Sequence, residues 1–194
     1  MENFIFYIQQ GFYHVLDKAA LDHVLFFIAL TIIFSYKSWK KALWLITFFT
    51  IAHTLTFGLS VYDLIEVKVD LVEFLIPITI LIPLLINIYR EIKQISNKKE
   101  NINIYFAFIF GLIHGLGFSN YFKMLLDDSD SKLLPLLKFS LGIEFAQILI
   151  VLIVLFLNYT IRFTPIKNKI WVIGISILLI LRIIPMLINR FPFG

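Results

Sequence analysis

Apolar residues occur along this chain in six long runs that few charged residues interrupt. The runs lie near residues 19–36, 42–61, 71–89, 103–122, 133–158 and 170–189. Each is close to the length of about 20 residues that an α-helix needs to cross the hydrocarbon core of a bilayer. The pattern predicts an all-α, polytopic integral membrane protein of about six transmembrane helices, forming a single domain over residues 1–194.

A seventh apolar segment, from Phe4 to Leu16, is shorter and contains Gln9, Gln10 and Gly11. We expect it either to extend the first helix outward or to lie along the membrane interface. The chain starts with an acidic residue and no Lys or Arg precedes this segment. Because a signal peptide begins with a basic region, we expect this start to be retained.

Composition narrows the class of protein and the chemistry open to it. Hydrophobic residues make up 60% of the chain and charged residues 15%, whereas soluble domains carry about 25% charged residues. The net charge of +4 is ordinary for a membrane protein and indicates no nucleic-acid partner. Because the chain has no cysteine, disulfides and thiolate metal sites are excluded, and any metal must be held by nitrogen or oxygen ligands.

Charge alternates in sign around the predicted loops. The loops after the first, third and fifth helices are basic, with Lys37, Lys40, Lys41, Arg90, Lys93, Lys98, Lys99, Arg162, Lys167 and Lys169. The other two loops are acidic, with Asp63, Glu66, Asp70, Asp127, Asp128 and Asp130. Because short basic loops stay in the cytoplasm, we expect a multi-pass protein of the cell (inner) membrane with both termini outside.

Several ionisable residues fall within or beside the predicted spans. They are His14, Asp22, His23, His53, Glu73, His114 and Glu144, and they include all four histidines. Each such side chain in hydrocarbon costs at least about 2.5–3.5 kcal/mol, so it needs a partner or a function. In the expected topology they all lie in the outer half of the membrane. A shared depth predicts one site rather than scattered packing residues.

The residue types favour a transition-metal site. Imidazole suits Ni, Zn, Cu and Fe, and carboxylates accompany it in mixed ligand sets. We expect His23, His53 and His114 as the first ligands, then Glu144 and Asp22, then Glu73 and His14. Carboxylates and hydroxyls often orient ligand histidines, a role open to Asp22, Glu73, Thr50 and Thr54.

Other polar and small residues are expected to serve packing. Gly111 and Gly115 flank His114 as a GxxxG pair, which lets two membrane helices approach closely. Asn87 is predicted to make an interhelical hydrogen bond.

Several short stretches resemble the HupE/UreJ family, small membrane proteins associated with hydrogenase and urease maturation. The matching stretches are Gly11-Phe12-Tyr13-His14, Asp22-His23, Phe49-Thr50-Ile51-Ala52-His53-Thr54, Val72-Glu73, Gly111-Leu112-Ile113-His114-Gly115-Leu116-Gly117-Phe118, and Gly142-Ile143-Glu144 with Gln147. The resemblance implies a six-helix protein linked to nickel or a similar metal, usually described as a secondary metal transporter. It also implies metalloenzyme maturation proteins as partners.

The leading hypothesis is therefore a transporter for Ni²⁺ or a related divalent ion. The alternative is a metal-dependent enzyme embedded in the membrane, since a metal with an open coordination position can activate water or oxygen. A proton relay would use the same residue types without metal, and a scaffold for partner proteins would need no metal. The inner half of the predicted bundle offers few polar residues, Asn87 and Ser176 among them, which disfavours a simple pore.

Overall fold

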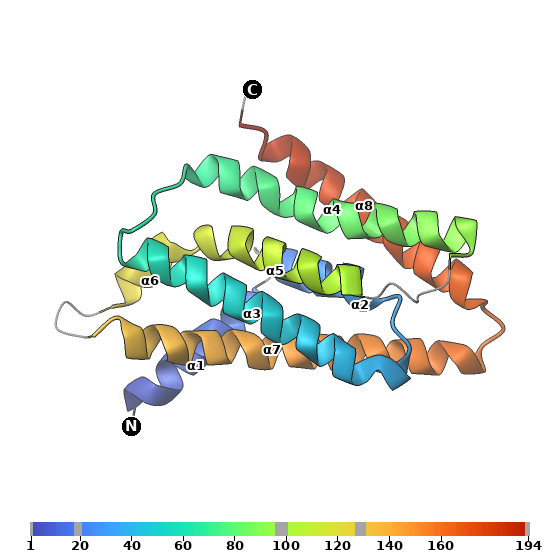
Figure 1. Cartoon of the computed structure of the whole chain (residues 1–194), viewed down its shortest axis with the longest axis horizontal. Helices are drawn as coiled ribbons and strands as arrows, with labels where there is room; N and C mark the ends of the chain where they lie inside the picture. Colours follow the sequence, from blue (N-terminus) through green and yellow to red (C-terminus); the bar gives the residue numbers. More distant parts are fainter. Residues whose placement is uncertain (1, 18–20, 96–100, 127–130, 193–194) are drawn as a thin grey trace.

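The computed structural model describes residues 2–17, 21–95, 101–126 and 131–192. Regular structure in this part of the chain is helical throughout: α1 (Glu2–Leu16), α2 (Asp22–Thr31), α3 (Trp39–Val61), α4 (Val69–Lys93), α5 (Asn101–Leu116), α6 (Ser119–Leu125), α7 (Leu133–Thr160) and α8 (Asn168–Asn189) (Figure 1). Short 3₁₀ turns at Tyr36–Ser38 and Ile161–Phe163 adjoin α3 and α7. The acidic loop expected at 127–130 and the turn at 96–100 lie outside the described residues. The all-α prediction is confirmed.

Four helices are long and apolar enough to cross a bilayer, namely α3, α4, α7 and α8. Two further apolar helices, α2 and α5, are shorter. The protein is thus a multi-pass membrane protein with four to six spanning elements among the described residues.

Two of the six predicted spans are interrupted, which corrects the expectation of continuous helices there. The predicted helix over 19–36 is helical only from Asp22 to Thr31, and these 10 residues cover about 15 Å, half of the hydrocarbon core. The predicted helix over 103–122 ends at Leu116, and α6 begins at Ser119. Gly117 lies in this second break, where its poor helix propensity helps to end α5.

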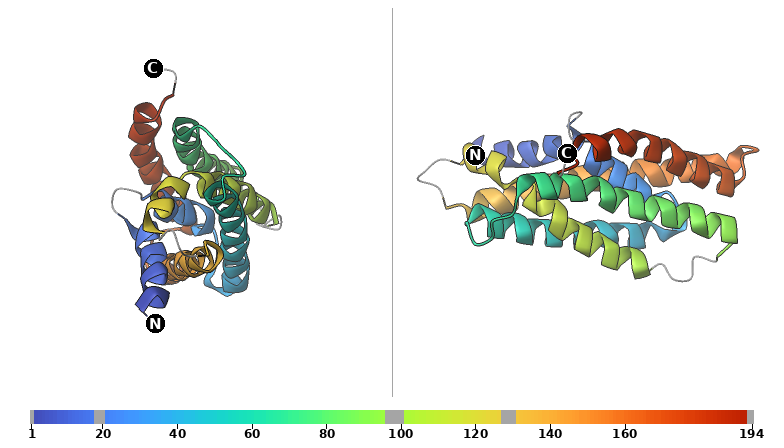
Figure 2. Two further views of the ribbon diagram at one scale, coloured as in Figure 1. Left: turned by 90° about the vertical axis from the view of Figure 1, so that its left-hand side faces the viewer. Right: turned by 90° about the horizontal axis from the view of Figure 1, so that it is seen from above.

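Helices α1 and α2 together run alongside α7, the first next to its N-terminal half and the second next to its C-terminal half (Figures 1 and 2). The α1–α7 crossing is close because both helices have glycine there: a Cβ at Gly11 would collide with the Phe139 carbonyl, and a Cβ at Gly142 with the Ile8 carbonyl. The segment from Phe4 to Leu16 is therefore a packed helix of the bundle.

The GxxxG pair of α5 packs against α3, as expected. A Cβ at Gly111 would lie 2.5 Å from the carbonyl oxygen of Phe49, and one at Gly115 would collide with the His53 carbonyl. This close approach brings His114 of α5 to the level of His53 in α3.

Two asparagines hold α2 in place. Asn87 donates to the carbonyl of Ala29 at 2.7 Å, which confirms its predicted interhelical hydrogen bond. The amide of Asn158 donates to the carbonyls of Ile32 and Phe34, each at 3.0 Å, just beyond the end of α2. Asn158 of α7 thereby ties the segment that follows α2 to α7.

The described parts of the basic loops gather at one end of the bundle, where α2, α4 and α7 end, and the link from α3 to α4 lies at the other end (Figure 1). At that second end Lys123 of α6 donates to the carboxylate of Asp63. The gathering of the basic loops at one end agrees with the loop pattern, and the orientation in the membrane stays a prediction.

Candidate metal site

Three of the four histidines lie at helix ends, and His53 lies within α3. His14 is in the last turn of α1, Asp22 and His23 open α2, and His114 is in the last turn of α5. The two breaks touch each other, since the His14 and Phe118 rings lie 3.7 Å apart between centroids. Helix C-termini carry partial negative charge, so the ends of α1 and α5 favour a cation near His14 and His114.

Three histidines converge closely enough to share an ion. His14, His23 and His53 each offer one ring nitrogen, and these atoms lie within 4.8 Å of one another. Two nitrogens bound to one ion lie at most about 4 Å apart, because metal–nitrogen bonds are about 2.0–2.1 Å long. Small side-chain rotations would therefore complete the coordination. We call His14, His23, His53 and His114 the histidine cluster.

His114 adjoins these three residues, with its ring 5.2 Å from that of His23. Its Nε2 lies 3.0 Å from the hydroxyl oxygen of Thr79. That hydroxyl donates its single hydrogen to the Ile76 carbonyl at 2.6 Å, so towards His114 it acts as acceptor. His114 therefore carries its proton on Nε2, and the lone pair of its buried Nδ1 is available to a ligand.

Asp22 fixes His23 in a similar way. Its Oδ1 lies 3.2 Å from Nδ1 of His23 and also accepts from the backbone N–H of His23 at 3.0 Å. A carboxylate accepts hydrogen bonds only, so the proton of His23 is on Nδ1 and the lone pair is on Nε2. Ligand histidines commonly donate their second nitrogen to a carboxylate in this manner. The orienting role expected for Asp22 agrees with this geometry.

The cluster contains several buried nitrogens without a hydrogen-bond partner among the described residues. They are Nε2 of His14 and His23, both ring nitrogens of His53, and Nδ1 of His114. His53 is fully buried, and His114 is only 2% exposed. Each unsatisfied buried polar group costs about 1–3 kcal/mol, and a bound cation would relieve this cost at several nitrogens at once.

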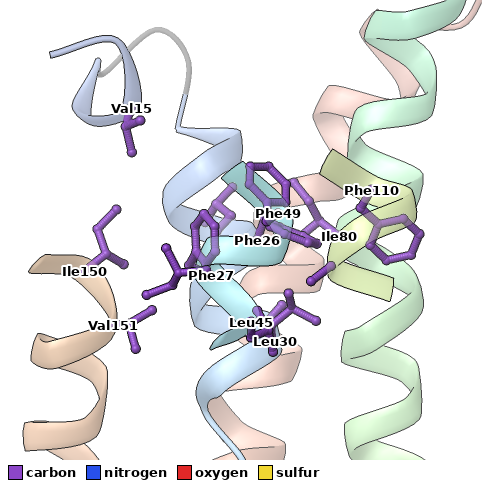
Figure 3. Packing of buried hydrophobic residues seen from close by; sticks show 14 of the residues in the cluster. Val15, Phe26, Phe27, Leu30, Leu45, Phe49, Ile80, Phe110, Ile150 and Val151 are labelled. Atoms are coloured by element: carbon purple, nitrogen blue, oxygen red, sulfur yellow. The ribbon is translucent and has the colours of Figure 1, made fainter. Parts of the chain in front are cut away.

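Aromatic side chains close the site on its sides and below. Phe49 lies against both His53 and His114, at 5.8 and 5.4 Å between ring centroids, and Phe26 lies 5.3 Å from His114. Figure 3 shows Phe26, Phe27 and Phe49 packed together in the core, above Leu30 and Leu45. The structure therefore brings the histidines together against a layer of buried apolar side chains.

Two predicted site residues lie outside the cluster. Glu73 is on the exposed side of α4. Glu144 is partly buried and accepts a hydrogen bond from Thr47 at 3.0 Å. It lines a groove of about 620 Å³ between α3 and α7, together with Thr50, Thr54 and Ser140. Among the acids proposed as ligands, the structure places only Asp22 against a histidine.

Neither Thr50 nor Thr54 makes the expected hydrogen bond to a histidine. Thr50 donates to Oε1 of Gln147 at 2.9 Å rather than to a histidine. The Thr54 hydroxyl has no hydrogen-bond partner within the described ranges. The orienting hydroxyl is instead that of Thr79, which sequence analysis did not single out.

Arg190 is a second residue that sequence analysis missed. It follows α8 directly, and its Nη1 lies 3.7 Å from Oδ2 of Asp22. No sequence signal links it to the site, because it lies beyond the last predicted span and 168 positions from Asp22. For Thr79 the available signal was a hydroxyl between two helix-interior prolines, Pro77 and Pro83.

Comparison with known proteins gives one match. No curated protein and no solved structure matches this chain. A family described as HupE / UreJ protein matches residues 1–190, which is nearly the whole chain and includes every histidine of the cluster. The chain therefore belongs to the HupE/UreJ family.

Proposed function

We propose that this protein transports a divalent transition metal ion of the nickel–cobalt class, which binds at the histidine cluster on its way across the membrane. The observation that carries the proposal is the convergence of ring nitrogens of His14, His23 and His53 within 4.8 Å inside a membrane protein. Membership of a family associated with nickel and cobalt transport supports it.

The donor chemistry supports this class of ion. Neutral imidazoles suit Ni, Co, Zn, Cu and Fe, whereas Mg²⁺ and Ca²⁺ prefer oxygen ligands. The hydrogen bonds to Asp22 and Thr79 leave His23 Nε2 and His114 Nδ1 as free lone pairs. Two of the four imidazoles are thereby held in the tautomer that a metal needs.

The breaks in α1–α2 and α5–α6 support movement of the ion. Discontinuous helices of transporters place ion sites at their interruptions, where backbone carbonyls are also free to coordinate. The aromatic layer below the cluster excludes a permanent pore. Release to the other side therefore requires the short helices α2 and α5 to shift relative to α3 and α4.

The same aromatic layer favours the second candidate, a metal-dependent membrane enzyme. An ion closed off by this layer and held by three or four imidazoles would keep an open position for a substrate, as in catalytic zinc sites. The substrate would reach it from the membrane or from the side of the bundle opposite the basic loops.

Reconstituted protein distinguishes the two. Proteoliposomes containing a metal-sensitive dye inside should accumulate Ni²⁺ or Co²⁺ when they carry the wild type, and should not when they carry His53→Ala. Glu73→Gln is the matched control, because Glu73 is ionisable but lies outside the cluster, and it should behave as the wild type. Stoichiometric metal that stays bound without any uptake would instead support the enzyme. Full uptake by His53→Ala would contradict the proposed site.

A further inference from the structure

The end of α8 reaches the opening residue of α2. Arg190, the residue that follows α8, has its Nη1 3.7 Å from Oδ2 of Asp22. This separation is within range of an ion pair and longer than a hydrogen bond of 2.7–3.2 Å. Nη1 is buried and forms no hydrogen bond with the described residues. The guanidinium is therefore close to the carboxylate without being locked to it.

The two oxygens of Asp22 have different partners. Oδ1 accepts both hydrogen bonds from His23, one from the ring and one from the backbone. Oδ2 faces Arg190. One carboxylate thus connects a ligand of the histidine cluster with a cationic side chain from a different helix.

Charge determines what this arrangement can accept. Asp22 is the acidic side chain that the structure places against the histidine cluster, and Arg190 lies beside it as the opposite charge. If a divalent cation bound at the histidine cluster while Arg190 stayed next to Asp22, several positive charges would lie together in a buried site, which is energetically costly. A metal bound to His23 and the guanidinium of Arg190 therefore compete for the compensating negative charge of Asp22.

The last turn of α8 can let Arg190 leave at modest cost. Pro185 lacks the N–H that would bond to the carbonyl one turn earlier, so this end of the helix is weakened. The backbone N–H of Arg190 donates to the carbonyls of Met186, at 3.1 Å, and Ile188, and the neighbouring Phe191 ring lies 5.6 Å from that of Phe74. Fraying of one turn would move the guanidinium away while the rest of α8 stays packed on α4.

We infer that Arg190 is a displaceable internal counter-cation, which pairs with Asp22 until a divalent cation binds at the histidine cluster and drives the end of α8 away. This inference deepens the proposed function and rests on it. Ion binding at the cluster and movement of the C-terminal end of α8 are then coupled. Arg190 also disfavours monovalent cations, since a single positive charge competes poorly with a guanidinium already in place.

The test is calorimetric titration of Co²⁺ into full-length protein in lipid nanodiscs. Arg190→Ala and Arg190→Gln should each bind Co²⁺ at least about tenfold more tightly than the wild type, because a positive charge paired with the carboxylate that orients His23 is removed. Arg190→Lys keeps the charge and should remain within about threefold of the wild type. Arg182→Ala removes an exposed arginine of the same helix and is the matched control, with unchanged affinity.

Two further measurements distinguish a failure of the role of Arg190 from a failure of the metal site. In an Asp22→Asn background, Arg190→Ala should bring a much smaller gain, because the guanidinium is no longer held at the site by the carboxylate. In the wild type, Co²⁺ should speed hydrogen exchange of the Arg190 amide, which needs no variant to fold. Equal or weaker Co²⁺ binding by folded Arg190→Ala and Arg190→Gln overturns the role of Arg190 alone. Absence of Co²⁺ binding in the wild type and in both variants overturns the metal site and this inference with it.

Discussion

Thr79 accepts a hydrogen bond from His114, with its Oγ1 3.0 Å from Nε2, while it donates its own proton to the Ile76 carbonyl at 2.6 Å. This pair fixes which nitrogen of His114 faces a ligand. Replacing Thr79 by Val keeps the shape and removes the acceptor, so the ring loses its preferred tautomer. We expect Thr79→Val to weaken Co²⁺ binding about 10–100-fold, as other losses of a ligand's hydrogen-bond partner do, whereas Thr79→Ser should retain most of the affinity.

The measurement for Thr79 is Co²⁺ affinity together with the visible absorption spectrum of the Co²⁺ complex, which reports ligand geometry. A variant that only loosened packing would lower the melting temperature and leave the spectrum of the bound ion unchanged. Wild-type affinity and spectrum in Thr79→Val would show that Thr79 does not orient His114.

Metal should stabilise the folded protein by linkage. A ligand at 100 times its dissociation constant adds about 2.7 kcal/mol to the free energy of unfolding. Adding Ni²⁺ should therefore raise the melting temperature of the wild type, and a chelator should reverse the rise. His53→Ala should show neither change, because His53 is fully buried in the cluster. An equal metal-induced rise in His53→Ala would mean that the ion binds elsewhere.

Gly115 should tolerate no side chain. A Cβ there would collide with the His53 carbonyl and the Thr56 hydroxyl, which would push α5 away from α3. We expect Gly115→Ala to lower the free energy of unfolding by about 1–3 kcal/mol, the usual range for overpacking, and to weaken metal binding by displacing His114. Gly174→Ala is the matched control in α8, where an added Cβ meets nothing within 4 Å. Denaturation in mixed micelles measures both variants, and equal stability of the two would contradict the close α3–α5 contact.

The ends of the bundle should lie on opposite sides of the membrane. The chain has no cysteine, so single cysteines can be introduced without background. A cysteine at Ser38 or Thr164, at the basic end, should be labelled only after the membrane is opened to the cytoplasm. A cysteine at Ser131 should react with an impermeant reagent from outside. The reverse labelling pattern would overturn the orientation and the expected direction of ion access.

The pair of Asp63 and Lys123 should give a small pH dependence at the end opposite the basic loops. The hydrogen bond from Lys123 lowers the pKa of the Asp63 carboxyl below its ordinary value of 3.8. Because the folded-state pKa is the lower one, the added stability is fully present above about pH 4 and is lost as the pH falls through the folded-state value. The pair is exposed, so its effect is modest. Asp63→Asn should be slightly less stable than the wild type at pH 7, and the difference in melting temperature should shrink as the pH falls below 3.8. A larger difference at pH 3 would contradict this assignment.

The sequence by itself determined the class of protein and the chemistry available to it. Three features depend only on local composition, which folding does not alter: the apolar runs of membrane-spanning length, the loops of alternating charge and the absence of cysteine. The four histidines were identifiable as one set because burying an ionisable group is costly wherever it lies. Glycine spacing likewise marked the close contact of α5, since only a missing side chain allows backbones to meet.

Only the tertiary structure decided which acids join the histidines and where helices break. A hydropathy profile averages over a window of residues, so it does not detect the helix breaks before Asp22 and after Leu116. The energetic cost of a buried charge shows that each acid needs a partner but does not identify that partner. Packing turns Glu73 outward, places Glu144 next to Thr47 and brings Asp22 to His23. Thr79 and Arg190 reach the site through contacts between helices distant in sequence, and no local pattern encodes such contacts.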